Sequence, residues 1–160
     1  DWSSDVSDLA LKLPQLPQGK DSVEVQHAVI KGNNFILDHA CRGGGWNHGN
    51  DITLGAYLPA YRLTTAEALL ALQDLKDDAK VKDGLKYLQS WQDKDTSCLS
   101  LAMSILALGA FGQSADKEVN FLLARQTKES GNFTQNTVTT ALSALALEAS
   151  LTGKSFIYVR

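Results

Sequence analysis

Two stretches of the chain, residues 97–110 and 134–147, contain no charged residue, and each alternates with a charged, amphipathic segment. A helix that is apolar or small on every side must be covered on every side, whereas an amphipathic helix buries only one stripe. The alternation therefore predicts two layers of helices, one inside and one outside.

The uncharged stretches belong to an internal repeat. Similar segments rich in Ala, Leu, Ser and Thr begin at Thr64, Ser100 and Thr139, so that their starts are 36 and 39 residues apart (100 − 64 and 139 − 100). Periods of about 20–50 residues are typical of repeat architectures. The sequence therefore predicts an all-α fold in which an outer helix, a turn and an inner helix occur three times. The segments ahead of the inner helices carry aromatic residues at Phe35, Tyr87 and Phe121.

Helical spacing and capping residues give the expected boundaries of these helices. Outer helices are expected at 22–40, 78–91 and 115–128, and inner helices at 64–75, 96–111 and 135–150. The residues expected at the N-caps are Thr64, Thr96 or Ser97, and Thr134 or Asn136.

The two ends of the chain differ from the repeats. Two prolines and a glycine exclude a long helix in residues 1–21, which we expect to cap the first repeat. Gly153 is a stop signal after the last inner helix, and the apolar residues behind it are expected to dock as a tail or to begin another helix. Residues 22–160 are expected to form one repeat domain.

Composition excludes several classes of protein. The 160 residues have a net charge of −3 and scattered basic residues, which argues against nucleic-acid binding. The uncharged runs are too short and too rich in Ser and Thr to span a membrane. No metal site and no cofactor are expected. A disulfide between Cys41 and Cys98 and two free, buried thiols both fit the sequence, and the free thiols are favoured. We expect a soluble protein, cytoplasmic or exported after processing.

The turns after the outer helices carry a signature of Gln, Gly and an aromatic residue. In the third repeat these are Gln126, Gly131 and Phe133, and in the first the glycines of 43–45 precede Trp46. A Gln side chain can bond the backbone of a turn, and Gly supplies positive φ. We expect these residues mainly to fasten neighbouring repeats together.

This signature resembles known repeat proteins. Phe121-Leu122, Gln126, Gly131 and Phe133 resemble the QW repeat of squalene and oxidosqualene cyclases, and residues 44–50 with 64–73 resemble bacterial prenyltransferase/squalene-oxidase repeat proteins. The resemblance covers about residues 22–150. It implies an α/α toroid, in which inner helices ring a central cavity, and about three hairpins imply an open arc.

The resemblance does not extend to catalytic motifs. Cyclases of the squalene type protonate their substrate with Asp-x-Asp-Asp, and the nearest string here, residues 74–78, is expected to be a solvated turn. Protein prenyltransferases hold zinc with Asp, Cys and His, but Cys41, His48 and Asp51 do not match their motif positions.

Candidate functional residues gather in the insertion 46–63 and at the start of the first inner helix. Loops on a rigid scaffold often carry function. Glu67, a charge on an inner helix, needs a wet cavity or a partner such as Arg62. The alternatives are that the insertion only packs over the arc and that the helix N-terminus accounts for Glu67. The candidate ligand-binding residues are Trp46, Asn47, His48, Asn50, Asp51, Thr64, Thr65 and Glu67.

Two functions fit these observations. An open arc leaves an apolar concave face, so we expect a non-catalytic binding module, part of a larger assembly or chain, that takes an apolar small molecule or a protein there and is able to form homo-oligomers. The alternative is a degenerate or partial terpene cyclase or prenyltransferase-like enzyme acting on an isoprenoid. Likeness of fold alone does not establish an activity.

Overall fold

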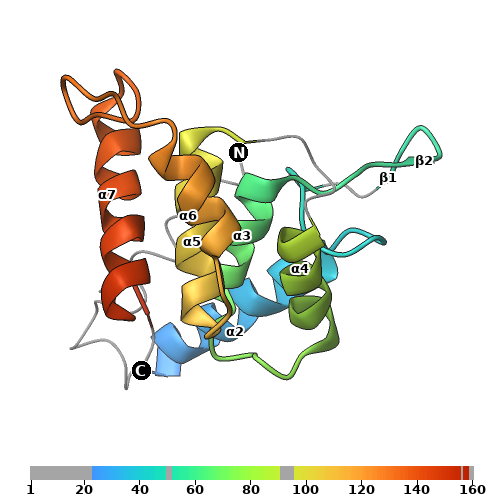
Figure 1. The fold of residues 1–160 in the computed structure, drawn as a ribbon. Helices are drawn as coiled ribbons and strands as arrows, with labels where there is room; N and C mark the ends of the chain where they lie inside the picture. Colours follow the sequence, from blue (N-terminus) through green and yellow to red (C-terminus); the bar gives the residue numbers. More distant parts are fainter. Residues whose placement is uncertain (1–22, 50–51, 91–95, 156, 159–160) are drawn as a thin grey trace.

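The computed structural model describes residues 23–49, 52–90, 96–155 and 157–158, and these are mainly helical (Figure 1). The predicted all-α class is confirmed. The expected capping segment, residues 1–21, lies outside the described residues. The described helices are α2 (Val23–Asp38), α3 (Arg62–Ala71), α4 (Ala79–Ser90), α5 (Cys98–Ala110), α6 (Asp116–Leu123) and α7 (Thr137–Thr152), and a short antiparallel hairpin joins β1 (Ile52–Thr53) to β2 (Ala56–Tyr57).

Five of the helices form the two predicted layers. The inner helices α3, α5 and α7 follow one another, with α5 packed against both of the others. The outer helix α4 packs on α3 and α5, and α6 packs on α5 and α7 (Figure 1). Each outer helix therefore covers the seam between two inner helices.

The first predicted outer helix does not join the outer layer. α2 runs across the ends of the other helices instead of beside α3 (Figure 1), and Ile36 is its only buried residue. Short connections make consecutive helices antiparallel neighbours. The connection from α2 to α3 contains the whole of residues 39–61, so no short turn holds the two helices side by side.

α5 lies at the centre of the core. All residues from Ser100 to Leu108 are buried, which confirms that this uncharged stretch is covered on every side. The hydroxyl of Ser104 is satisfied within the helix, because it donates to the carbonyl of Ser100 at 2.7 Å. The expectation of an open, apolar concave wall is therefore wrong for α5.

α7 is covered on one side only. Its buried residues are small, Ser143, Ala146 and Ala149, and they face the core. Val138 is 66% exposed and Leu151 is 87% exposed. The second uncharged stretch is thus not enclosed, contrary to the expectation. α5 and α6 pack against α7, and the spacing of its buried residues places them on one side of the helix.

The turn after α6 shows why this helix ends earlier than predicted. α6 ends at Leu123, and the following residues form a turn in which Gln126 Nε2 donates to the carbonyl of Gly131 at 2.9 Å. Gly131 has a φ of 70°. The predicted use of a Gln side chain and a positive-φ glycine in this turn is confirmed, and these residues belong to the turn rather than to the helix.

The capping predictions for the last two inner helices are confirmed. Ser97 Oγ accepts from the Ser100 N–H at 3.2 Å, and Asn136 Oδ1 accepts from the Thr139 N–H at 3.0 Å. α7 stops at Gly153, whose φ is 66°.

The residues behind Gly153 dock as a tail. Ile157 is buried, and its carbonyl accepts a hydrogen bond from Gln73 Nε2 at 2.8 Å. The same amide nitrogen donates to the carbonyl of Leu70 at 2.8 Å. The tail is thereby fixed to the C-terminal end of α3.

The glycine turn after α2 has the predicted positive φ angles. Gly44 and Gly45 have φ values of 87° and 77°. A Cβ on Gly44 would lie 2.9 Å from the carbonyl oxygen of Asp83. Gly44→Val is therefore expected to lower the free energy of unfolding by about 1–3 kcal/mol, measured by urea denaturation. Gly43→Val is the control, because Gly43 has no neighbouring atom within 4 Å of its Cβ position. Equal stability of the two variants would contradict this account of the turn.

Candidate functional site

Trp46, the first residue of the insertion, is fully buried and joins three segments. Its indole Nε1 donates to the carbonyl of Ile36 in α2 at 2.6 Å. Its backbone N–H donates to Thr65 Oγ1 at 2.9 Å, and its carbonyl accepts from Thr64 Oγ1 at 2.7 Å. Three of the candidate ligand-binding residues thus fasten the insertion to α2 and α3. Their predicted role toward a ligand stays a prediction.

The start of α3 follows from the same contacts. Tyr61 occupies the N-cap position without a side-chain cap bond, and its N–H donates to the carbonyl of Trp46 at 2.9 Å. The prediction that Thr64 caps this helix is wrong, because α3 begins two residues earlier and the Thr64 hydroxyl is directed to the Trp46 carbonyl.

Glycines make room for this junction. A Cβ on Gly84, in the middle of α4, would lie 2.6 Å from Cζ3 of Trp46. A Cβ on Gly45 would lie 2.6 Å from Thr65 Oγ1. The indole ring therefore packs directly on the backbone of an outer helix.

The remaining candidates in the insertion differ in exposure. Asn47 is buried, and its side chain accepts from the Gly49 N–H at 3.0 Å and donates to the carbonyl of Pro59 at 3.4 Å. His48 is exposed, with its ring centroid 5.4 Å from that of Tyr61. Asn50 and Asp51 lie outside the described residues, so the structure does not place a His48–Asp51 pair.

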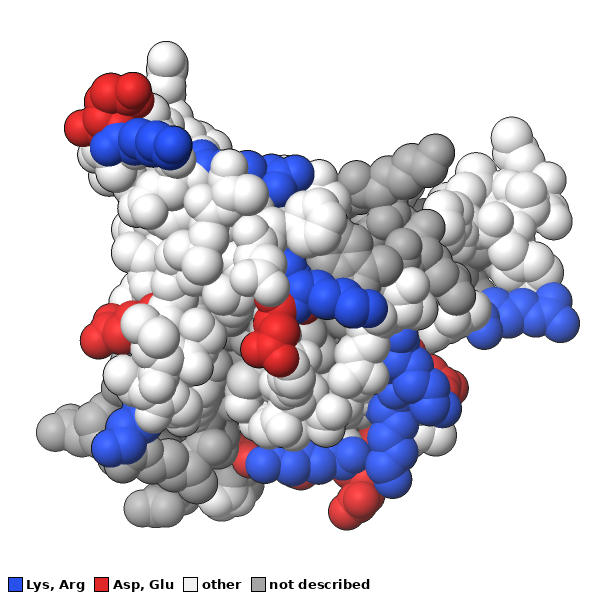
Figure 2. Space-filling view, in the orientation of Figure 1, with Lys and Arg blue, Asp and Glu red and all other residues white. Residues whose placement is uncertain are grey.

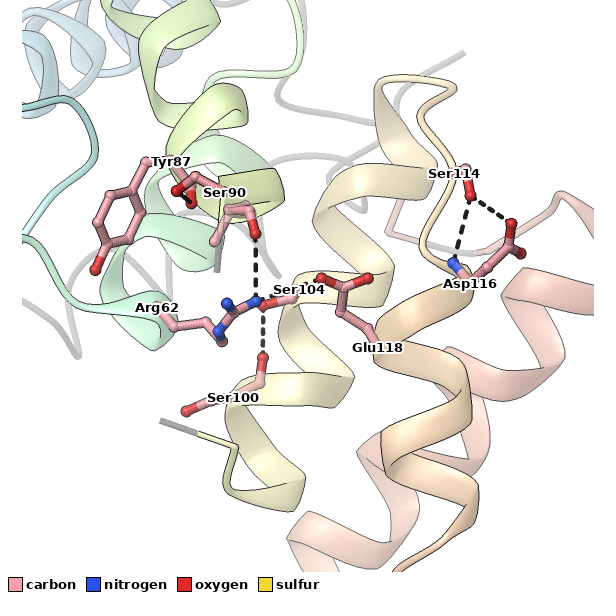
Figure 3. Close-up of polar contacts among 9 residues, drawn as sticks. Arg62, Tyr87, Ser90, Ser100, Ser104, Ser114, Asp116 and Glu118 are labelled. Atoms are coloured by element: carbon pink, nitrogen blue, oxygen red, sulfur yellow. Dashed lines mark hydrogen bonds and ion pairs between the residues drawn. The ribbon is translucent and has the colours of Figure 1, made fainter. Parts of the chain in front are cut away.

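Arg62 forms a buried ion pair that the sequence did not predict. Its Nη1 lies 3.4 Å from Glu118 Oε1 of α6 and 3.4 Å from the carbonyl of Leu88 in α4. The side chains of the two charged residues are 1% and 4% exposed. Figure 3 shows the guanidinium reaching from α3 toward Glu118 past Ser104 of α5. The pair therefore links one inner helix to both outer helices.

Glu67, the last candidate, is half-buried on α3. The ion-pair partner shown for Arg62 is Glu118, which is 56 residues away in the chain. Predicting this contact from the sequence would require knowing which residues of α3 and α6 lie opposite each other.

The aspartate string of residues 74–78 is the solvated turn that was predicted. Asp77 is exposed, and Asp78 Oδ1 accepts from the N–H groups of Lys80 and Val81 at 2.7 and 3.3 Å. Asp78 therefore caps the start of α4. None of its aspartates is buried.

Both cysteines are buried and free, which confirms the favoured prediction. Cys98 Sγ donates to the carbonyl of Phe133 at 3.3 Å. Within the described ranges, no group of three or more His, Cys, Asp and Glu side chains could hold a metal ion.

The β-hairpin inside the insertion was not predicted from the sequence. It projects from the body of the molecule (Figure 1), and the residues at its tip are exposed, with Leu54 fully so. Leu54 and Gly55 both have positive φ values, 51° and 78°, as a tight two-residue hairpin turn requires. The strands have two residues each and the turn lacks an Asn-Gly or Asp-Gly pair, so the usual sequence signal was absent.

The structure also contains a pocket of about 330 Å³, apart from the residues that surround Trp46. It is bordered by the C-terminal ends of α5 and α7, the N-terminal end of α6 and Tyr158. None of the candidate residues that the structure describes lines it. Pockets formed by the ends of several helices leave no periodic signal in a sequence.

Comparisons with protein-family models, curated proteins and solved structures found no match for the chain. The likeness to squalene-cyclase and prenyltransferase repeats therefore rests on the sequence motifs alone. Among the described helices, none has both the length and the apolar character needed to cross a membrane.

Proposed function

We propose that the chain is a helical-repeat interaction module that assembles through α7, and that α7 binds a second copy of the chain. The exposed face of α7 carries this proposal. Val138 and Leu151 are mostly exposed on a helix whose one charged residue is Glu148. Figure 2 shows mainly uncharged atoms along the side of the molecule that α7 forms.

Comparison of α7 with α5 supports a helical partner. Both helices are rich in Ala, Leu, Ser and Thr, and α5 is covered on two sides by α3 and α7. α7 uses only one of its sides. Covering the other side with a helix of the same kind would remove apolar surface from water, which is favourable.

The distribution of residues on α7 favours a second α7 in antiparallel orientation. Thr137, Ala141, Ala144, Glu148 and Leu151 follow helical spacing along the exposed face. In a two-fold pair centred near Ala144, Leu151 of each copy lies beside Thr137 of the other. The small residues meet at the centre, where they permit close approach, and each Glu148 lies toward the N-terminal half of its partner helix.

This dimer is expected to be weak. One helix per copy provides less contact than the roughly 1,200–2,000 Å² that stable interfaces bury. The dimer should therefore form reversibly as the protein concentration rises.

Sedimentation velocity over a concentration series tests the proposal. Thr137→Glu combined with Leu151→Glu is expected to abolish the dimer, because like charges would face each other at both ends of the helix pair. Thr137→Glu combined with Leu151→Lys is expected to retain it, because an antiparallel pair brings each Glu beside a Lys. Both positions are exposed, so the stability of the monomer should change by less than about 0.5 kcal/mol per substitution.

Leu54→Glu at the tip of the β-hairpin is the matched control. It removes a fully exposed leucine away from α7 and should leave the dimer unchanged. A wild-type protein that stays monomeric at all concentrations contradicts the proposal. Loss of the dimer in the Glu/Lys variant to the same extent as in the Glu/Glu variant contradicts the antiparallel arrangement.

A further inference from the structure

The pocket at the C-terminal ends of α5 and α7 points to a function beyond assembly. Its volume of about 330 Å³ lies at the lower end of the range of small-molecule sites, about 300–1,000 Å³. Ile105 of α5, Val119 of α6 and Ala149 of α7 contribute to its wall. Each of three helices thus contributes an apolar side chain to the wall, beside polar residues and glycines.

Tyr158 adds a polar group to this wall. Its hydroxyl lies so close to α5 that a Cβ on Gly109 would overlap it. The structure gives this hydroxyl no hydrogen-bond partner within the described residues, and burial raises the pKa of Tyr158. The hydroxyl therefore stays protonated, and it can donate to or accept from a bound molecule.

The charge of the lining favours a positively charged ligand. Among the described residues that line the pocket, Asp116 is the only charged one, and its carboxylate accepts from Ser114 Oγ at 2.7 Å (Figure 3). The C-terminal ends of α5 and α7 add partial negative charge. The N-terminus of α6 carries the opposite partial charge, which Asp116 in its first turn offsets.

We infer that this pocket binds a small organic cation with an apolar body, of the arylalkyl-ammonium class. The ammonium group lies toward Asp116 and the two helix C-termini, where it offsets their negative charge. The hydrocarbon body lies against Ile105, Val119 and Ala149. The Tyr158 hydroxyl accepts a hydrogen bond from the ammonium group.

Titration with three probes that share a 2-phenylethyl group tests the inference. 2-Phenylethylammonium is expected to bind saturably and to shift the amide NMR signals of Gly109, Gly112 and Gly153, which line the pocket. 2-Phenylethanol should bind more weakly, and 3-phenylpropionate should not bind. Absence of binding by the amine, or equal binding by the alcohol or the carboxylate, overturns the inference.

Two variants locate the site. Asp116→Asn and Tyr158→Phe are each expected to weaken binding of the amine about fivefold, since the first removes the negative charge and the second removes the hydroxyl acceptor. The matched controls are Asp77→Asn and Tyr57→Phe, which change exposed residues elsewhere. Binding that the pocket variants and the controls alter equally would place the amine at another site and overturn the inference. Dimerisation through α7 is measured separately by sedimentation velocity. Failure of the amine to bind would therefore not contradict the dimer, and absence of the dimer would not contradict amine binding.

Discussion

Replacement of Trp46 by alanine is expected to lower the free energy of unfolding by about 3–5 kcal/mol, the usual cost of removing a fully buried tryptophan. The substitution empties the space between α2, α3 and α4 and leaves the carbonyl of Ile36 without its indole donor. Chemical denaturation followed by circular dichroism measures the effect. Tyr57→Ala on the exposed β-hairpin is the control, and its cost should be less than about 0.5 kcal/mol.

Gly84→Ala tests the same junction from α4. Exchange of Gly for Ala inside a helix normally stabilises it by about 0.5–1 kcal/mol. Here the added methyl group would lie 2.6 Å from the Trp46 ring, so we expect a loss of about 1–3 kcal/mol. A gain in stability would show that the indole does not pack on α4 as described.

Breaking the buried ion pair is the second change expected to have a large effect. Glu118→Leu leaves the Arg62 guanidinium buried without its carboxylate, which should cost about 3–5 kcal/mol. Arg62→Met should cost a similar amount, because it leaves Glu118 buried and unpaired. Urea denaturation of each variant gives these values.

The double variant separates the interaction from the cost of the substitutions. Arg62→Met with Glu118→Leu removes both charges. The double variant should therefore lose less free energy of unfolding than the two single variants lose together, and no more than about what one single variant loses. The control is Lys86 and Asp83, whose charged atoms are closer, at 2.9 Å, but exposed. Breaking this surface pair should cost less than about 1 kcal/mol. Additive losses for Arg62 and Glu118 would contradict their coupling.

The features of the fold that depend on residues close together in the sequence were predictable. Uncharged helices, the caps at Ser97 and Asn136 and the positive φ of Gly44 follow from local chemistry. The crossing of α2 was not predictable, because it depends on where Trp46 attaches to the helix end. The sequence of α7 also resembles that of a buried helix, and exposure depends on which segments surround it.

The candidate site was less predictable than the fold for a related reason. Trp, Thr and Asn in a loop can bind a ligand or hold the loop in place, and the residue types are the same in both cases. The contacts of Trp46, Thr64 and Thr65 show the second use. The pocket beside Tyr158 is lined by residues from four separate segments. The pattern of a single sequence does not indicate that these segments come together.

The contact between Trp46 and Gly84 also restricts how the chain can evolve. A side chain at position 84 becomes tolerable only after the residue at position 46 has become smaller, since the indole occupies the space that a Cβ would need. Mutations at the two positions should therefore be accepted in one order and rejected in the other. Homologous chains are expected to show this as covariation: glycine at 84 wherever 46 is tryptophan, and larger residues at 84 only where it is not.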